Sequence, residues 1–161
     1  MQRALRKASA KELREGIQMH IEQTQVQIER VEQAMEPMGV RPGRKVCEAM
    51  RGLVEEAQHE IEEHDEKGPI LDLVIVAGMQ RIEHYEIAAY GTNVALAEAL
   101  GEKQVEKLLS ETLEEEKQTN LKLTEVTQKA IMPDALAGQE EEEEGGDERG
   151  GGRSGRRRKV A

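Results

Sequence analysis

Two glutamates that lie three residues apart, Glu83 and Glu86, stand in a stretch of sequence that is otherwise built to be buried. Residues 70–100 are rich in Ile, Leu, Val and Ala. An ionised carboxylate without a partner in such an interior costs several kcal/mol, so a metal ion, a partner charge or a chemical role must compensate for it. In a soluble helical bundle, a bound metal ion is a common way to hold several carboxylates together. The sequence therefore predicts metal ligands in this segment.

A third carboxylate, Glu116, lies on a later amphipathic segment. The helices predicted over 69–100 and 103–131 flank Gly101, and such a short connection makes an antiparallel hairpin. Glu86 precedes Gly101 by 15 residues and Glu116 follows it by 15, which predicts that the two lie level, with Glu83 about one turn away. Carboxylates at one level of a bundle are how non-haem metal centres are assembled, because hard or borderline divalent ions take oxygen ligands.

His20, Glu22 and Asn120 are weaker candidates for metal ligands. His20 and Glu22 lie on the helix predicted over 9–35, and Asn120 lies one turn after Glu116. His20 could bind a metal through a neutral ring nitrogen, or it could be an ordinary hydrogen-bonded histidine at the edge of the core.

A metal-free interpretation of the same glutamates stands beside this one. Glu83 could pair with Arg81 or a facing lysine, and Glu86 could form a hydrogen bond with Tyr90 or Asn120. Residues 114–117 could be a solvated run of charges. A single Glu-x-x-Glu spacing in a helix is common, so the apolar surroundings and the level partner carry the metal hypothesis.

Four long helices account for most of the sequence. The 3.6-residue period of apolar side chains predicts helices over 9–35, 44–64, 69–100 and 103–131, each ended by Pro or Gly. With two Tyr, no Phe and no Trp, the core must consist of aliphatic side chains and Met. The prediction is an all-α antiparallel helical bundle that forms one domain over residues 1–137.

Residues 138–161 differ abruptly in composition from this domain. They hold seven acidic and six basic residues among glycines, with almost no apolar side chain. Such a segment cannot compensate for the entropy lost on ordering, so we expect a disordered tail.

The overall composition excludes several classes of protein. The formal net charge of −10 argues against general nucleic-acid binding. Cys47 is the only cysteine, so no intrachain disulfide can form, and its apolar neighbours predict a buried thiol. The sequence has no run of 18 apolar residues and no signal-peptide core, which predicts a cytoplasmic protein without a membrane partner.

Several segments resemble the YciE/YciF family of ferritin-like proteins, and the resemblance covers about residues 5–130. The segments that carry it are His20-Ile21-Glu22-Gln23-Thr24, Gln27-Ile28-Glu29-Arg30, Cys47-Glu48-Ala49-Met50-Arg51-Gly52-Leu53-Val54-Glu55-Glu56, Glu83-His84-Tyr85-Glu86-Ile87-Ala88-Ala89-Tyr90-Gly91, Leu96-Ala97-Glu98-Ala99-Leu100-Gly101 and Leu108-Leu109-Ser110-Glu111-Thr112-Leu113-Glu114-Glu115-Glu116-Lys117.

The resemblance implies a four-helix bundle similar to rubrerythrin and ferritin that can hold two metal ions and forms a homodimer. It also implies a role in bacterial stress, with ferroxidase-like chemistry assigned by analogy. Glu83 and Glu86 match the ligand-bearing third helix of the family, and Glu116 matches the fourth. Thr119 or Asn120 stands where the fourth helix usually has a histidine.

A second departure from the family concerns the start of the bundle. Relatives carry a further helix with a ligand glutamate before the segment at which this sequence begins, and position 23, often Glu in relatives, is Gln here. The resemblance then makes 9–35 the family's second helix and 44–64 a crossover helix, so that the bundle is incomplete at its N-terminus. Two hypotheses follow: an Fe- or Mn-binding stress protein, with Tyr85 or Tyr90 beside the metal, or a metal-free self-associating protein with a charged recruiting tail.

Overall fold

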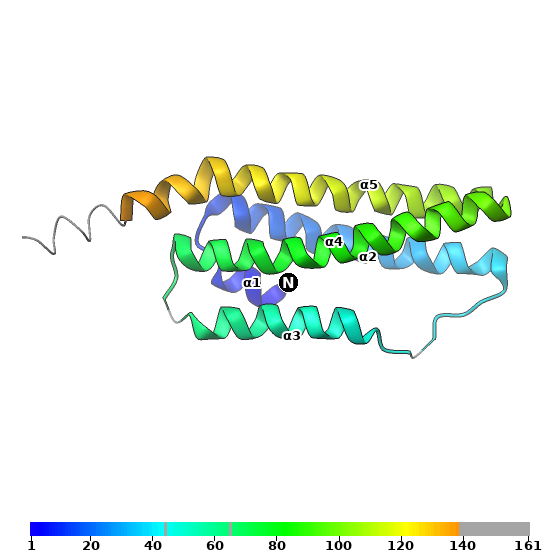
Figure 1. The fold of residues 1–161 in the computed structure, drawn as a ribbon, viewed down its shortest axis with the longest axis horizontal. Coiled ribbons are helices and arrows are strands. Elements are labelled where there is room, and N and C mark those ends of the chain that lie inside the picture. Colours follow the sequence, from blue (N-terminus) through cyan, green and yellow to red (C-terminus); the bar gives the residue numbers. More distant parts are fainter. Residues whose placement is uncertain (44, 65, 139–161) are drawn as a thin grey trace, which may run out of the picture.

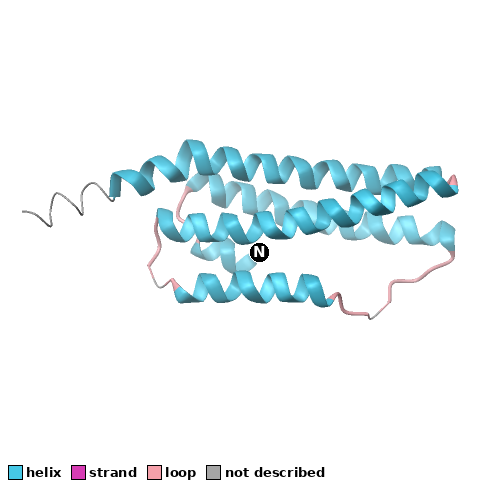
Figure 2. Ribbon diagram, viewed as in Figure 1, coloured by secondary structure: helices cyan, strands magenta, loops and turns pink. Residues whose placement is uncertain are grey.

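The structure is a computed structural model that describes residues 1–43, 45–64 and 66–138, and these residues form helices and no strands. Figures 1 and 2 show the five α-helices of the described chain. They are α1 (Gln2–Lys7), α2 (Lys11–Met35), α3 (Glu48–Glu63), α4 (Pro69–Leu100) and α5 (Lys103–Val126). The predicted all-α bundle is confirmed, whereas the tail from residue 139 onwards lies outside the described residues.

The bounds of α4 agree with the sequence-based prediction because both ends carry strong signals. Pro69 occupies the first turn of the helix, where its missing N–H leaves no hydrogen bond unmade. At the other end Gly101 has φ +75°, a left-handed conformation that L side chains rarely adopt. The N–H of Glu102 donates to the carbonyl of Ala97, which closes the last turn of α4.

Two N-terminal features differ from the prediction. The short helix α1 has too few residues to show a helical period, yet it buries Ala4 against the core. Helix α3 begins at Glu48, later than the predicted start near Arg44, which itself lies outside the described residues. Residues 45–47, just before α3, have no regular secondary structure and are exposed, and Val46 is among the exposed apolar side chains.

The prediction that the last helix ends at Ile131 is wrong. A π-turn over Thr127–Ile131 follows α5, in which the N–H of Met132 donates to the carbonyl of Thr127. Residues 132–138 then continue as α-helix, with Pro133 in their first turn. Proline is tolerated there because the wider turn has already interrupted the regular ladder of hydrogen bonds.

Helix α4 lies at the centre of the arrangement. It packs against both α5 and α3, and α5 also packs against α2. Figure 1 shows α2 and α4 running in the same direction, with α3 and α5 running the opposite way and α1 lying beside α3. The place of α3 outside the α2–α4–α5 group agrees with the crossover helix that the resemblance implies.

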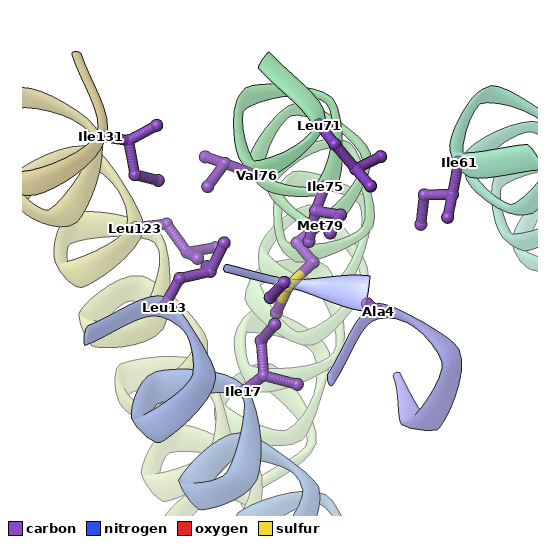
Figure 3. Close-up of a cluster of buried hydrophobic side chains, with 11 residues drawn as sticks. Ala4, Leu13, Ile17, Ile61, Leu71, Ile75, Val76, Met79, Leu123 and Ile131 are labelled. Carbon is purple, nitrogen blue, oxygen red and sulfur yellow. The ribbon is translucent and has the colours of Figure 1, made fainter. Parts of the chain in front are cut away.

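Two apolar clusters hold the bundle together, one towards each end. The larger one joins α1, α2, α3, α4 and the C-terminal part of α5, and Figure 3 shows Leu13 beside Leu123 and Leu71 directed toward Ile61 of α3. The smaller one contains Ala34, Ala97 and Val105 near the α4–α5 turn. Within the described residues no helix combines the length and the apolar character needed to cross a membrane. Between the two clusters the buried side chains are polar.

Candidate metal centre

Three buried side chains from three different helices meet between the apolar clusters. His20 of α2, Glu83 of α4 and Glu116 of α5 each offer one ligand atom, and these atoms all lie within 4.8 Å of one another. Their exposed fractions are 5%, 1% and 0%, respectively. Such complete burial of two glutamates is rare for an unliganded acid, which makes this cluster the strongest candidate site in the described chain.

The helical period explains why polar side chains reach this position. His20 lies one turn after the buried Ile17, and Glu83 lies one turn after the buried Met79. Each therefore continues the stripe that faces the core. Glu116 lies between the buried Thr112 and Thr119 on α5, so the prediction that residues 114–117 form a solvated charge run is wrong for this residue.

The hydrogen bonds of the cluster are incomplete. His20 Nε2 lies 3.0 Å from Glu83 Oε1. His20 Nδ1, Glu83 Oε2 and both carboxylate oxygens of Glu116 are buried and have no hydrogen-bond partner among the described residues. Buried polar atoms without partners are costly, so an imidazole and two carboxylates arranged in this way fit a divalent ion that takes mixed nitrogen and oxygen ligands.

The electrostatics of the cluster show how close these groups lie. Burial opposes the protonated form of His20, but the hydrogen bond and the negative charge of Glu83 outweigh it and raise the pKa of His20. Burial, reinforced by Glu83, raises the pKa of Glu116 to about 9. Without a metal, one proton therefore stays on Glu116 at neutral pH. With a metal, the ion would take the place of that proton.

Glu86 lies beside the cluster rather than in it. Its carboxylate is half-buried and lines an open groove on the side of α4, and burial followed by the charge of Glu83 raises its pKa. Tyr90, one turn further, lines the same groove, and burial followed by Glu86 and Glu116 raises its pKa to about 12. The structure thus groups Glu83, and not Glu86, with Glu116 and His20, because α4 turns Glu83 towards α2 and α5.

Neither Glu22 nor Asn120 joins the three grouped residues. Glu22 is exposed and accepts a hydrogen bond from Gln18. The Asn120 side chain accepts a hydrogen bond of 3.1 Å from Gln80. Arg81, considered above as a partner for Glu83, pairs instead with Glu60 of α3.

A second polar network next to Glu116 was not predicted from the sequence. Arg30 binds both carboxylate oxygens of Glu115, at 2.7 and 3.0 Å, and also donates to Thr112. Gln27, which is 4% exposed, donates to Glu115 at 3.1 Å. Burial opposes the charge of Glu115, but Arg30 outweighs it and lowers the pKa of this carboxyl. Arg30 thereby holds Glu115 in a charge pair. The sequence signal for this network was Gln27, which lies seven residues, or two helical turns, after His20 and therefore on the same face of the helix.

The prediction of a buried Cys47 is wrong. The thiol is exposed at the start of α3, and its sulfur lies 2.9 Å from the hydroxyl of Tyr85. The apolar stripe of α3 begins only after this residue, because the helix itself begins at Glu48.

The chain is similar to proteins of known sequence and structure over most of its length. The sequence profile of the domain of unknown function DUF892 matches residues 1–136. Protein YciF of Escherichia coli strain K12 is 46% identical over 122 residues, which are 75% of this chain and 73% of YciF.

Two solved structures resemble the fold. The crystal structure of YciF, described as an E. coli stress protein, has a TM-score of 0.72 at 45% identity and covers 77% of this chain and 78% of its own. The structure of YcfI from Rhodopseudomonas palustris, provisionally described as a structural protein, has a TM-score of 0.72 at 41% identity and covers 76% and 77%. These matches confirm the YciF-like resemblance seen in the motifs, and the chain belongs to the DUF892 family.

Proposed function

We propose that this chain binds a divalent iron or manganese ion through His20, Glu83 and Glu116. The observation that carries the proposal is the convergence of ligand atoms from three helices within 4.8 Å, with buried carboxylate oxygens that lack any partner in the described chain. A cation in their midst would compensate for the charge that burial otherwise makes costly. The same cation would tie α2, α4 and α5 together.

Glu86 and Tyr90 extend this proposal to the edge of the cluster. A second ion, as in a dinuclear centre, would need a further carboxylate. Glu86 is the nearest candidate, because it lies close enough to the cluster for its negative charge to raise the pKa of His20. Tyr90 lies close enough to both Glu86 and Glu116 for their charges to act on its hydroxyl. Bound iron would supply one-electron chemistry towards dioxygen or peroxide, and the surrounding residues would orient the ligands and exclude bulk water.

The similarity to the E. coli stress protein YciF supports a role for this metal binding in a stress response. A ferritin-like role, with Fe(II) as a substrate that is oxidised, is the finer form of the same proposal. Its test is the rate at which the protein accelerates Fe(II) oxidation in air, compared with the variant Glu116→Gln.

The rival is a metal-free structural protein, in keeping with the description of YcfI. In that case a protonated His20 pairs with an ionised Glu83, and Glu116 keeps a proton and contacts Glu83. The raised pKa values of His20 and Glu116 favour this arrangement whenever no metal is present. The two functions therefore differ in whether the metal competes successfully with two protons.

Metal analysis of protein purified without chelators separates the two functions. We expect iron or manganese to be retained by the native chain, and saturating Mn(II) at about 100 times its Kd to raise the free energy of unfolding by about 2.7 kcal/mol. Both effects should be lost in Glu83→Gln and Glu116→Gln. The control is Glu114→Gln, which makes the same substitution at an exposed position on α5. No bound metal and no stabilisation by Fe(II) or Mn(II) would exclude the proposal.

A further inference from the structure

The Arg30–Glu115 pair lies next to the candidate metal centre but supplies none of its three ligand atoms. Glu115 directly precedes the buried Glu116 on α5. The guanidinium of Arg30 donates to both carboxylate oxygens of Glu115, at 2.7 and 3.0 Å, and to the hydroxyl of Thr112 at 3.0 Å. Thr112 is fully buried, one turn before Glu116 on the same face of α5. The charge of Arg30 therefore reaches the side of α5 that faces the cluster.

Gln27 connects this pair to the cluster. Its side chain is buried on α2, and its amide donates to Glu115 at 3.1 Å. The same amide lies near enough to Glu116 to lower the pKa of that carboxyl. The charge of Arg30 also acts on Tyr90, whose hydroxyl feels the charge of Glu116 as well. The pair and the cluster are thus close enough for their charges to interact.

The total charge beside a bound ion depends on this pair. With a neutral His20, the carboxylates of Glu83 and Glu116 carry two negative charges, which balance the charge of a divalent ion. A third negative charge from Glu115 would shift the preference towards a trivalent ion, because the attraction grows with the charge of the ion. Arg30 cancels this third charge.

We propose that Arg30 is a positioning residue that sets the charge preference of the metal centre. By holding and neutralising Glu115, it limits the negative charge beside the ion to that of Glu83 and Glu116, and so raises the preference for a divalent over a trivalent ion. The assignment rests on the proposed function and adds to it the charge state of the ion that the site retains. Arg30 acts through Glu115 and does not bind the metal itself.

Removing the positive charge of Arg30 tests this assignment in the full chain. In Arg30→Gln the carboxylate of Glu115, with 27% of its side chain exposed, stays in contact with water and ionised at pH 7. The affinity for Mn(II), measured by calorimetry, should rise about tenfold. A trivalent ion gains half as much again, so the preference for Fe(III) over Fe(II) should rise about threefold. The potential of bound iron should then fall by about 30 mV, at about 59 mV per tenfold change.

Glu115→Gln should have the opposite effect. It leaves the charge of Arg30 compensated only in part, by the exposed Glu111 at 3.5 Å. Binding of Mn(II) should therefore weaken, and the potential of bound iron should rise. The double variant Arg30→Gln/Glu115→Gln should return both quantities close to the wild-type values. A purely structural role predicts instead that each single variant weakens binding, because each breaks the same pair.

Arg30→Lys and Arg3→Gln serve as controls. Arg30→Lys keeps the charge but loses the two parallel hydrogen bonds, so its potential should stay close to that of the wild type. Arg3 pairs with Glu62 between α1 and α3, outside the three helices that carry the ligands. Arg3→Gln removes the same charge there and should change neither the affinity for Mn(II) nor the potential.

The outcomes separate this assignment from metal binding itself. Shifts in the same direction for Arg30→Gln and Glu115→Gln, or no shift in either, would overturn the role of Arg30 if the chains are folded by circular dichroism and bind Mn(II). If Arg30→Gln does not fold, the recovery of affinity in the double variant over Glu115→Gln decides the question, and no recovery would overturn the role. A wild-type chain that binds no metal would refute the proposed function and this role together.

Discussion

Replacing Glu116 by Gln should stabilise the metal-free protein, although it removes a side chain at the centre of the bundle. The carboxyl of Glu116 ordinarily ionises near pH 4.5, and burial followed by Glu83 raises its pKa in the folded chain to about 9. At pH 7 the unfolded chain has released this proton and the folded chain has not. The wild-type protein therefore loses stability as the pH rises from 4.5 towards 9.

The size of the effect follows from these two values. Over about 2.5 pH units, at about 1.36 kcal/mol per unit, the loss amounts to roughly 3 kcal/mol at pH 7. Gln has no proton to lose in either state, and its amide can donate to the unpartnered Oε2 of Glu83. After allowance for imperfect packing of the amide, Glu116→Gln should be more stable by about 1–3 kcal/mol at pH 7. The advantage should vanish near pH 4.5.

Urea unfolding with EDTA at pH 5, 6, 7 and 8 measures this difference directly. The gap between the variant and the wild type should widen with pH, because His20 is present in both proteins and cancels in the comparison. Adding Mn(II) should reverse the order, since the wild type alone keeps the full ligand set. A variant that is less stable than the wild type at every pH with EDTA would show that Glu116 is ionised and paired in the native state, which would refute this reasoning.

Three further predictions concern other parts of the molecule. Mn(II) binding at pH 7 should release about one to two protons, from Glu116 and His20, and calorimetry in two buffers with different ionisation heats would detect this; identical heats would contradict it. The buried carboxylate of Asp72 accepts hydrogen bonds from the backbone N–H groups of Ser9 and Ala10, just before α2, at 2.8 and 2.7 Å. Asp72→Ala should therefore lower the free energy of unfolding in urea by about 2–3 kcal/mol, and Asp72→Asn should lower it less. Equal losses of free energy in the two variants would show that the charge and the second acceptor of Asp72 are unimportant. Gly78→Ala should lower the free energy of unfolding by about 1–3 kcal/mol, because its new Cβ would lie 2.9 Å from the Cβ of Ala57. Gly91→Ala, on the same helix with nothing within 4 Å, should raise the free energy of unfolding by about 0.5–1 kcal/mol. Equal shifts in melting temperature would contradict the close approach of α3 and α4.

The sequence was sufficient to predict the long helices and the buried acids. Pro69 and Gly101 mark the ends of α4 because their backbone chemistry restricts where a helix can begin or stop. The burial of Glu83 followed from its place among aliphatic residues. The length of the hairpin, in contrast, predicted Glu86 level with Glu116, whereas the structure groups Glu83 with Glu116.

The rotation of α4 could not be predicted in the same way. Its first half is apolar on nearly every side, so the sequence pattern does not select which of Glu83 and Glu86 faces the core. That choice depends on where α2 and α5 pack, which is a property of the whole fold. The same long-range packing brings His20 to Glu83 across 63 positions of sequence.

The π-turn at Thr127–Ile131 changes the sequence spacing of the buried side chains at the C-terminal end of the bundle. Leu123 and Ile131 both belong to the larger apolar cluster, although they are eight positions apart and an α-helix would return to the same side after seven. The turn accommodates one additional residue, as an insertion into a regular helix would, while Ile131 keeps its contact with the core. A regular α-helix would have to lose one residue between Leu123 and Ile131 to keep both side chains on the side that faces the core.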